Sequence, residues 1–325
     1  MRHLYLNRFI LSTLRGILVI LAICLCSYHS ASAQEEPEAT RSLWDSEFLQ
    51  KRPKATKSQP TKSKPKLTTI RYKRKETIAA AVPATSKPES TKVASSSPSR
   101  LTIGVTAWRL RPAKVSDDKA VRLLERTDDA DSQRELTPER IDLDTPLEEG
   151  QKIRLSIEVP RSGYLYVIDR EKYADGTVSE PYLIFPVLRG GKLENNQVKA
   201  GVLVDIPGDD DPNPYFKVTR SGPTQVGEVL TLLIAPTPLA ELKIGNKIQK
   251  LPAEQFASWE KQWSTQVEML ELVDGSGNPI TKEEKIAGTG GRILTRDDPP
   301  PQTLYSVTCQ PNTTVMVPVM LKLEK

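Results

Sequence analysis

Alternation of apolar and polar positions predicts a series of β-strands through the middle of the chain. Residues 151–159 alternate strictly, which is typical of a strand with one buried face and one face in water, and the apolar positions are Ile153, Leu155, Ile157 and Val159. A turn-like segment and the run 164–168 follow, so we expect a hairpin. Asp175-Gly176 indicates a further reversal before a third strand at 182–185. The pattern predicts a three-stranded meander.

Other segments predict strands that pack on or beside this meander. Residues 101–110 alternate around Trp108, and 198–206 alternate again, while 215–219 is a shorter candidate. The run 228–235 is almost continuously apolar, which favours a central strand buried on both faces. The highly charged stretch 113–150 predicts a long surface excursion.

The period changes after Pro252. The positions Phe256, Trp259, Trp263, Val267 and Leu270 fall on one helical stripe, so the spacing predicts an amphipathic helix over about 252–271 that packs on the sheet. A sugar-stacking aromatic face is the alternative reading of the same stripe. Residues 303–309 and 314–323 predict a closing hairpin, and Pro318 places the last strand at an edge or a bulge because proline donates no hydrogen bond.

These elements together predict a mostly β domain at 101–325. We expect an antiparallel β-sandwich, immunoglobulin-like or similar, with its core at about 136–240, a C-terminal amphipathic helix and closing strands at about 303–323.

The N-terminus has the features of a secretory signal peptide at 1–33. Arginines precede an apolar run at 16–26, and an A-x-A motif places cleavage between Ala33 and Gln34. Lipidation at Cys24 and an uncleaved anchor remain open as alternatives. We therefore expect export to the periplasm, the cell surface or the exterior.

Cleavage at this position limits the chemistry of the mature chain. Both histidines (His3 and His29) and two of the three cysteines (Cys24 and Cys26) precede the cleavage position. The mature chain would then contain no histidine and only Cys309, so histidine-dependent catalysis and an internal disulfide are excluded. Cys309 lies in an apolar run and is expected to be buried, and an intermolecular disulfide would require it to be exposed.

Residues 34–100 are rich in Pro, Ser, Thr and Lys and predict a disordered basic arm. This arm has a net charge of +8, whereas residues 101–325 have a net charge of −6. It would act as a spacer or contact an anionic membrane surface or polymer, and it could fold back onto its own domain or bridge neighbouring molecules. With Tyr72 as its only interleaved aromatic residue, the basic run gives no stacking platform for specific nucleic-acid binding. The candidate contact residues are Lys51, Arg52, Lys54, Lys57, Lys62, Lys64, Lys66, Arg71, Lys73, Arg74 and Lys75.

Several stretches resemble one bacterial family. LTPERIDLDTPLEEGQKIRLSIE at 136–158, GYLYVIDRE at 163–171, the YADGT turn and YLIFP are similar to the family called domain of unknown function 4384. The likeness extends over roughly 101–323, with LTIGVTAWRLRPA at its start and DDPPPQTLYSV near its end. The resemblance implies a fold and an envelope or extracellular setting, and it transfers no catalytic residue.

Carboxylates are the remaining groups that could carry chemistry. Asp169, Glu171 and Asp175 cluster beside the predicted turn, and paired carboxylates can hydrolyse glycosides. The alternative is a charged hairpin end that faces water. Asp209, Asp210 and Asp211 are weak calcium candidates, because three adjacent acids lack the alternating spacing of a calcium loop.

We find no phosphate-binding loop and predict no cofactor. The sequence thus predicts an exported, non-enzymatic binding or scaffolding protein of the cell envelope, with an envelope protein, a peptide or an anionic polymer as partner. A carboxylate-dependent glycoside hydrolase that acts on envelope polysaccharide is the alternative.

Overall fold

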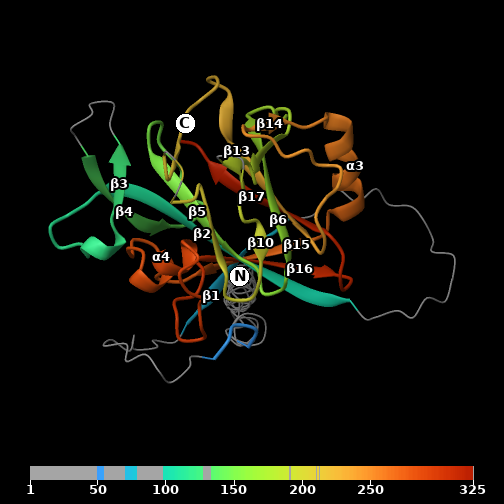
Figure 1. Cartoon of the computed structure of the whole chain (residues 1–325). Coiled ribbons are helices and arrows are strands. Elements are labelled where there is room, and N and C mark those ends of the chain that lie inside the picture. The colour runs from blue at the N-terminus through green and yellow to red at the C-terminus, as the bar shows by residue number, and fades with distance from the viewer. Residues whose placement is uncertain are drawn as a thin grey trace, which may run out of the picture. The chain divides into compact units, whose positions relative to one another are not determined.

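The computed structural model describes residues 50–54, 70–78, 98–126, 133–189, 192–209, 211 and 213–324 (Figure 1). All of them belong to the compact unit Ala39–Lys325, and the unit Met1–Glu38 lies outside the described residues. The predicted signal peptide with its cleavage position at Ala33 and Gln34 lies outside them too. None of the helices in the described part of the chain is long and apolar enough to cross a membrane.

The described residues are mostly β. The helices are α3 (Ala253–Trp263), α4 (Lys282–Gly288) and the short 3-10 helix η2 (Lys119–Val121). The strands are β1 (Tyr72–Ile78), β2 (Ser99–Pro112), β3 (Leu123–Arg126), β4 (Gln133–Ile141), β5 (Lys152–Glu158), β6 (Gly163–Tyr173), β7 (Tyr182–Phe185), β8 (Leu188–Arg189), β9 (Lys192–Leu193), β10 (Gln197–Val198), β11 (Leu203–Ile206), β12 (Phe216–Lys217), β13 (Gln225–Ala235), β14 (Gln249–Lys250), β15 (Val267–Leu272), β16 (Thr303–Cys309) and β17 (Val315–Lys322).

Two antiparallel sheets contain most of these strands. The nine-stranded sheet has the order β1-β15-β16-β2-β4-β3, and β5 pairs with β2 and carries β11 and β12 on its other edge. The six-stranded sheet has the order β14-β7-β6-β13-β17, with β10 paired to β6. One hydrophobic cluster takes side chains from both sheets, including Ile103 and Leu155 from the first and Val167, Leu232 and Val317 from the second.

The predicted three-stranded meander is wrong at its first turn. Strand β5 belongs to the nine-stranded sheet, whereas β6 belongs to the six-stranded sheet, so the chain changes sheets at 159–162. The β6–β7 hairpin is confirmed, and Gly176 adopts φ +87° at its turn. Alternation reveals which residues of a strand share a face, but the partner of that strand depends on contacts remote in sequence.

The central position of the predicted strand 228–235 is confirmed. Strand β13 lies between β6 and β17. Its side chains alternate between two hydrophobic clusters: Leu232 belongs to the cluster between the two sheets, and Leu233 belongs to the cluster that includes residues of α3. Trp108 is fully buried. Cys309 is half-buried and packs against the cluster between the sheets.

The helix predicted over 252–271 is wrong in two respects: its second half is not helical, and it is not the last element of the domain. Helix α3 ends at Trp263, and four strand or helix elements follow it. Its residues Phe256, Trp259 and Trp263 pack against the six-stranded sheet, and the rings of Trp259 and Trp263 stack at 5.5 Å. Residues 267–272 form β15, which is buried on both faces and therefore shows no clear period of two.

The closing strands are confirmed, but their pairing as a hairpin is wrong. Strand β16 pairs with β15 and β2 in one sheet, and β17 pairs with β13 in the other. Pro318 lies in β17 at the edge of its sheet, as predicted. The expected surface excursion at 113–150 is also wrong in part, because β3 and β4 extend the nine-stranded sheet there.

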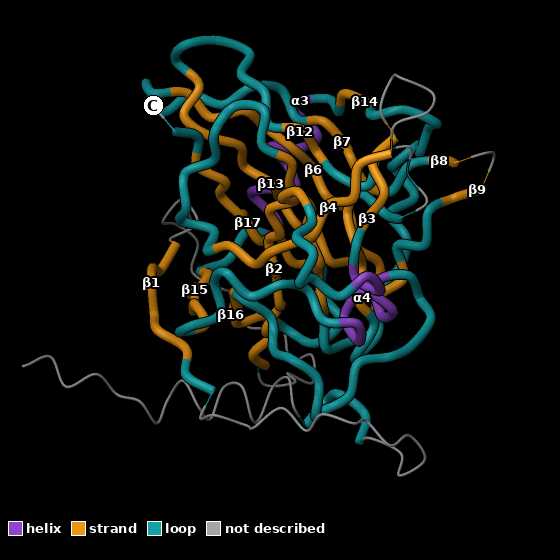
Figure 2. Tube along the Cα trace, turned by 90° about the vertical axis from the view of Figure 1, so that its left-hand side faces the viewer, coloured by secondary structure: helices purple, strands orange, loops and turns teal. Residues whose placement is uncertain are grey.

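The predicted disordered arm is wrong for two described segments. Strand β1 pairs with β15 at the edge of the nine-stranded sheet (Figure 2), and the buried Tyr72 donates its hydroxyl to the carbonyl of Pro301 at 2.6 Å. Arg52 is only 2% exposed and pairs with Glu158. This part of the arm therefore folds back onto its own domain.

The predicted contact residues of the arm lie in different environments. Arg52 is buried, so it is not an anionic-surface contact. Lys75 pairs with Asp144 and Arg74 pairs with Glu268. The exposed positions are Lys51, Lys54, Arg71 and Lys73, and the positions outside the described residues are Lys57, Lys62, Lys64 and Lys66.

Candidate functional site

The structure brings two of the three predicted catalytic carboxylates together and leaves the third apart. Asp169 and Glu171 lie on β6, where Glu171 stands opposite Glu228 of β13. Asp175 lies at the exposed turn, where its carboxylate accepts hydrogen bonds from the backbone and hydroxyl of Thr177. Glu228, which begins the strand predicted at 228–235, completes a cluster that the sequence did not indicate.

The carboxyl groups of Asp169 and Glu228 are close enough to shift each other's pKa. Burial, with the charges of Asp169 and Glu171 added, raises the pKa of Glu228 to about 8. Burial raises the pKa of Asp169 to about 6. Glu171 accepts hydrogen bonds from the hydroxyl groups of Tyr173 and Ser221.

Glycoside hydrolysis needs space for a sugar between two carboxyl groups, which lie about 5 Å apart in retaining enzymes and farther apart in inverting enzymes. The pocket described next is lined by none of Asp169, Glu171 and Glu228.

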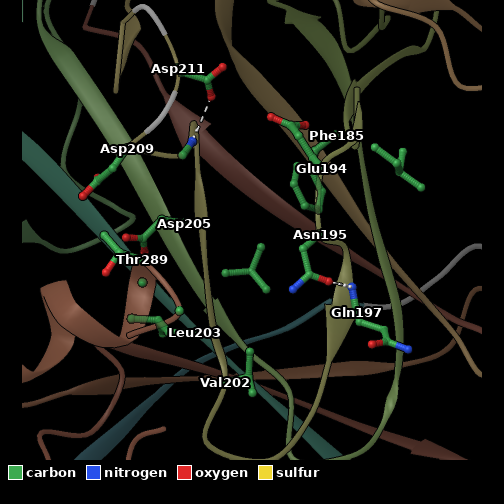
Figure 3. A pocket seen from close by; sticks show the side chains of 15 residues that line it. Phe185, Glu194, Asn195, Gln197, Val202, Leu203, Asp205, Asp209, Asp211 and Thr289 are labelled. Carbon is green, nitrogen blue, oxygen red and sulfur yellow. Dashed lines mark hydrogen bonds between the residues drawn. The ribbon is translucent and has the colours of Figure 1, made fainter. Parts of the chain in front are cut away.

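A pocket of about 480 Å³ lies between the edge strand β11 and the segments around β7 and β10. Figure 3 shows Phe185, Glu194, Asn195 and Gln197 along one side, with the aromatic ring beside the amide and carboxylate groups. The backbone N–H of Val187 donates to Glu194 at 2.8 Å, which fixes this carboxylate at the wall.

The opposite wall of the pocket also carries carboxylates. Asp205 lies on β11, Asp209 and Asp211 lie in the loop that follows it, and Thr289 lies at the end of α4 (Figure 3). The backbone N–H of Gly208 donates to Asp211 at 2.9 Å. Acidic groups therefore face the cavity from both sides.

A buried polar network fixes the carboxylates of Asp205 and Asp209 in this wall. Arg154 donates to Asp205 at 2.7 Å and to Asp209 at 2.6 Å, although its side chain is only 2% exposed. Ser156 donates to Asp205 at 2.5 Å and accepts from the indole nitrogen of Trp108 at 2.7 Å. The prediction of a wet face on β5 is therefore wrong: Arg154, Ser156 and Glu158 are buried.

The calcium prediction gains no support from this arrangement. Asp209 is paired with Arg154, Asp211 accepts from the backbone, and Asp210 lies outside the described residues. Among the described residues no group of three or more His, Cys, Asp or Glu side chains is placed to hold a metal ion. The acids Glu194, Asp205, Asp209 and Asp211 outnumber the nearby cations Arg154 and Lys285, and this excess of negative charge favours a cationic ligand.

Comparison with protein-family models, with curated protein sequences and with solved structures gives no match for this chain. The resemblance to domain of unknown function 4384 stays a prediction that rests on the sequence stretches quoted above.

Proposed function

We propose that this chain is a non-enzymatic binding or scaffolding protein of the bacterial cell envelope. The signal-peptide pattern at 1–33 and the family resemblance support export to the periplasm, the cell surface or the exterior. The proposal includes the finer fold prediction of an immunoglobulin-like or similar sandwich. Its support is the hydrophobic cluster that both antiparallel sheets share.

The acidic pocket is the proposed ligand site. The observation that carries this assignment is the placement of Glu194 on one wall and of Asp205 and Asp209 on the other, each oriented by a hydrogen bond from the chain itself. Oriented carboxylates beside an aromatic ring and side-chain amides suit an ammonium or guanidinium group. The ligand class is therefore a cationic part of a peptide or of an envelope polymer.

The glycoside-hydrolase alternative is not favoured. None of Asp169, Glu171 and Glu228 lines the pocket, and the carboxylates at the pocket are fixed by Arg154 or by backbone N–H groups. Fixed, paired carboxylates are arranged for binding rather than for proton transfer.

Calorimetric titration with a trilysine peptide tests the proposal. We expect the unmodified full chain to bind this peptide and to bind its side-chain-acetylated form at least about tenfold more weakly, because acetylation removes the positive charge. The variants Glu194→Gln and Asp209→Asn keep the size of these side chains and one acceptor oxygen but remove the negative charge, so each should weaken binding. Glu149→Gln, at an exposed position away from the pocket, is the matched control.

Equal affinity for the charged and acetylated peptides would contradict the proposed ligand class. Failure of both peptides to bind would remove the pocket from the proposal. Release of reducing sugar from envelope polysaccharide by the unmodified chain, lost in Asp169→Asn, would support the hydrolase instead.

A further inference from the structure

A second binding site lies around the guanidinium group of Arg52. Its Nε and one terminal nitrogen donate to the two carboxylate oxygens of Glu158 at 2.7 and 2.5 Å. The other terminal nitrogen donates to the carbonyl oxygens of Thr295, Asp298 and Pro299 at 3.1–3.3 Å. We call these four acceptor residues the arginine slot.

The same site also binds the backbone on either side of Arg52. The guanidinium group of Arg296 donates to the carbonyl of Gln50 at 2.6 Å and to that of Arg52 at 3.1 Å. The backbone N–H of Arg296 donates to the carbonyl of Pro53 at 3.3 Å. Gly201 (φ +77°) lies against the ring of Pro53, and a side chain there would meet that ring. The domain thus recognises one side chain and the carbonyl groups of its neighbours, as peptide-binding sites do.

The slot is specific for a guanidinium group for two physical reasons. Glu158 is only 1% exposed on the outer face of the nine-stranded sheet, so without a cation its carboxylate would be a buried, uncompensated charge. The acceptors also divide between the nitrogens of the group: the Glu158 carboxylate accepts from Nε and one terminal nitrogen, and three carbonyls accept from the other, which suits the forked donor set of arginine. A lysine ammonium group is a point donor and cannot reach all of them.

The ligand in the structure behaves as a tethered peptide. Residues 50–54 form no strand or helix, and the contacts that hold them include those of Arg52, of three backbone carbonyls and of the Pro53 ring. Fifteen residues, 55–69, separate this segment from Ile70, the next described residue. A tether of this kind supplies a local concentration on the order of millimolar, which occupies a site without high intrinsic affinity.

We propose that the arginine slot is a peptide-docking site for segments that carry arginine followed by proline, and that the chain's own residues 50–54 fill it in cis. The same segment of a second copy would enter once the tethered segment leaves. None of the four residues of the slot lines the acidic pocket. The slot does not depend on the ligand of that pocket.

Fluorescence anisotropy with a labelled peptide of residues 48–56 tests this proposal. The full chain carrying Arg52→Ala has an empty slot and should bind the peptide, whereas the unmodified chain should bind it at least about tenfold more weakly because its slot is filled. A peptide with lysine in place of arginine should lose at least about tenfold in affinity for the Arg52→Ala chain. Lys54→Ala changes an exposed neighbour and should behave like the unmodified chain.

Two results would overturn the proposal: no binding of the peptide to a folded Arg52→Ala chain, or equal binding of the arginine and lysine peptides. If Arg52→Ala fails to fold by circular dichroism, a protease site placed within residues 60–65 of the otherwise unmodified chain replaces it. After cleavage the N-terminal fragment should stay bound and be displaced by excess arginine peptide but not by the lysine peptide. A fragment that neither peptide displaces would also refute a docking site.

Discussion

Breaking the ion pair of Arg154 should destabilise the fold strongly, and removing both partners should restore much of the loss. Arg154→Met leaves Asp205, which is 7% exposed, without its cation and with the carboxylate of Asp209 nearby. Removing one partner of a buried pair costs about 3–5 kcal/mol. Asp205→Asn should cost less, about 1–3 kcal/mol, because Arg154 still pairs with Asp209 and an amide oxygen still accepts from Ser156.

The double variant Arg154→Met with Asp205→Asn separates the effect of the broken ion pair from any unrelated destabilisation caused by the two substitutions. It contains no buried, unpaired charge at this position, so its loss should be smaller than that of Arg154→Met alone by about 1–3 kcal/mol. Urea unfolding followed by tryptophan fluorescence measures all three variants, and Trp108 reports locally because its indole donates to Ser156. Losses that simply add, or an Arg154→Met loss below about 1 kcal/mol, would refute the reasoning.

Two further predictions concern pH and backbone packing. Because the folded-state pKa values of Glu228 and Glu271 are each raised to about 8, the folded chain binds more protons than the unfolded chain between about pH 4.5 and 8. Stability should therefore fall as pH rises through this range. Urea midpoints measured at pH 5 and pH 8 should differ less for Glu228→Gln than for the unmodified chain, because this variant cannot lose the proton of Glu228. An equal difference in the two chains would contradict the assignment. Gly288→Ala should cost about 1–3 kcal/mol because its methyl group would collide with the carboxylate of Asp205, whereas Gly222→Ala, which meets no atom within 4 Å, should be nearly neutral in the same denaturation assay.

Much of the strand content could be predicted from the sequence, because burial on one face or on both leaves a local pattern. Strands β5, β7, β11 and β13 lie where alternation or an apolar run indicated them. Assignment to sheets could not be predicted in the same way. Strands β5 and β6 are adjacent in sequence and belong to different sheets, since pairing depends on contacts with β2 and β13, which are far away in the chain.

The candidate sites were harder to predict than the strands. Asp169 and Glu171 were indicated, because they lie on one strand next to a recognisable turn, but their partner Glu228 comes from β13 and carried no local signal. Arg52 was assigned to a disordered arm because its neighbours are basic and proline-rich. That composition predicts disorder for the segment in isolation, but it contains no information about the buried carboxylate of Glu158 with which Arg52 pairs.

The polar face of the nine-stranded sheet explains why strict alternation on β5 was misleading. Two ion pairs join this face to segments outside the sheet, Glu158 to Arg52 and Arg140 to Glu284 of α4, and a third links Arg154 to Asp205 of the neighbouring strand β11. A hydrophobic face would accept any apolar covering segment. A charged face rejects every segment that lacks the complementary charge, because the mismatch leaves a buried ion that costs several kcal/mol. Polar residues in an alternating strand therefore do not by themselves indicate solvent. Here they select the segments that cover the sheet, which is why the arginine of a basic arm and the acid of α4 meet on one surface.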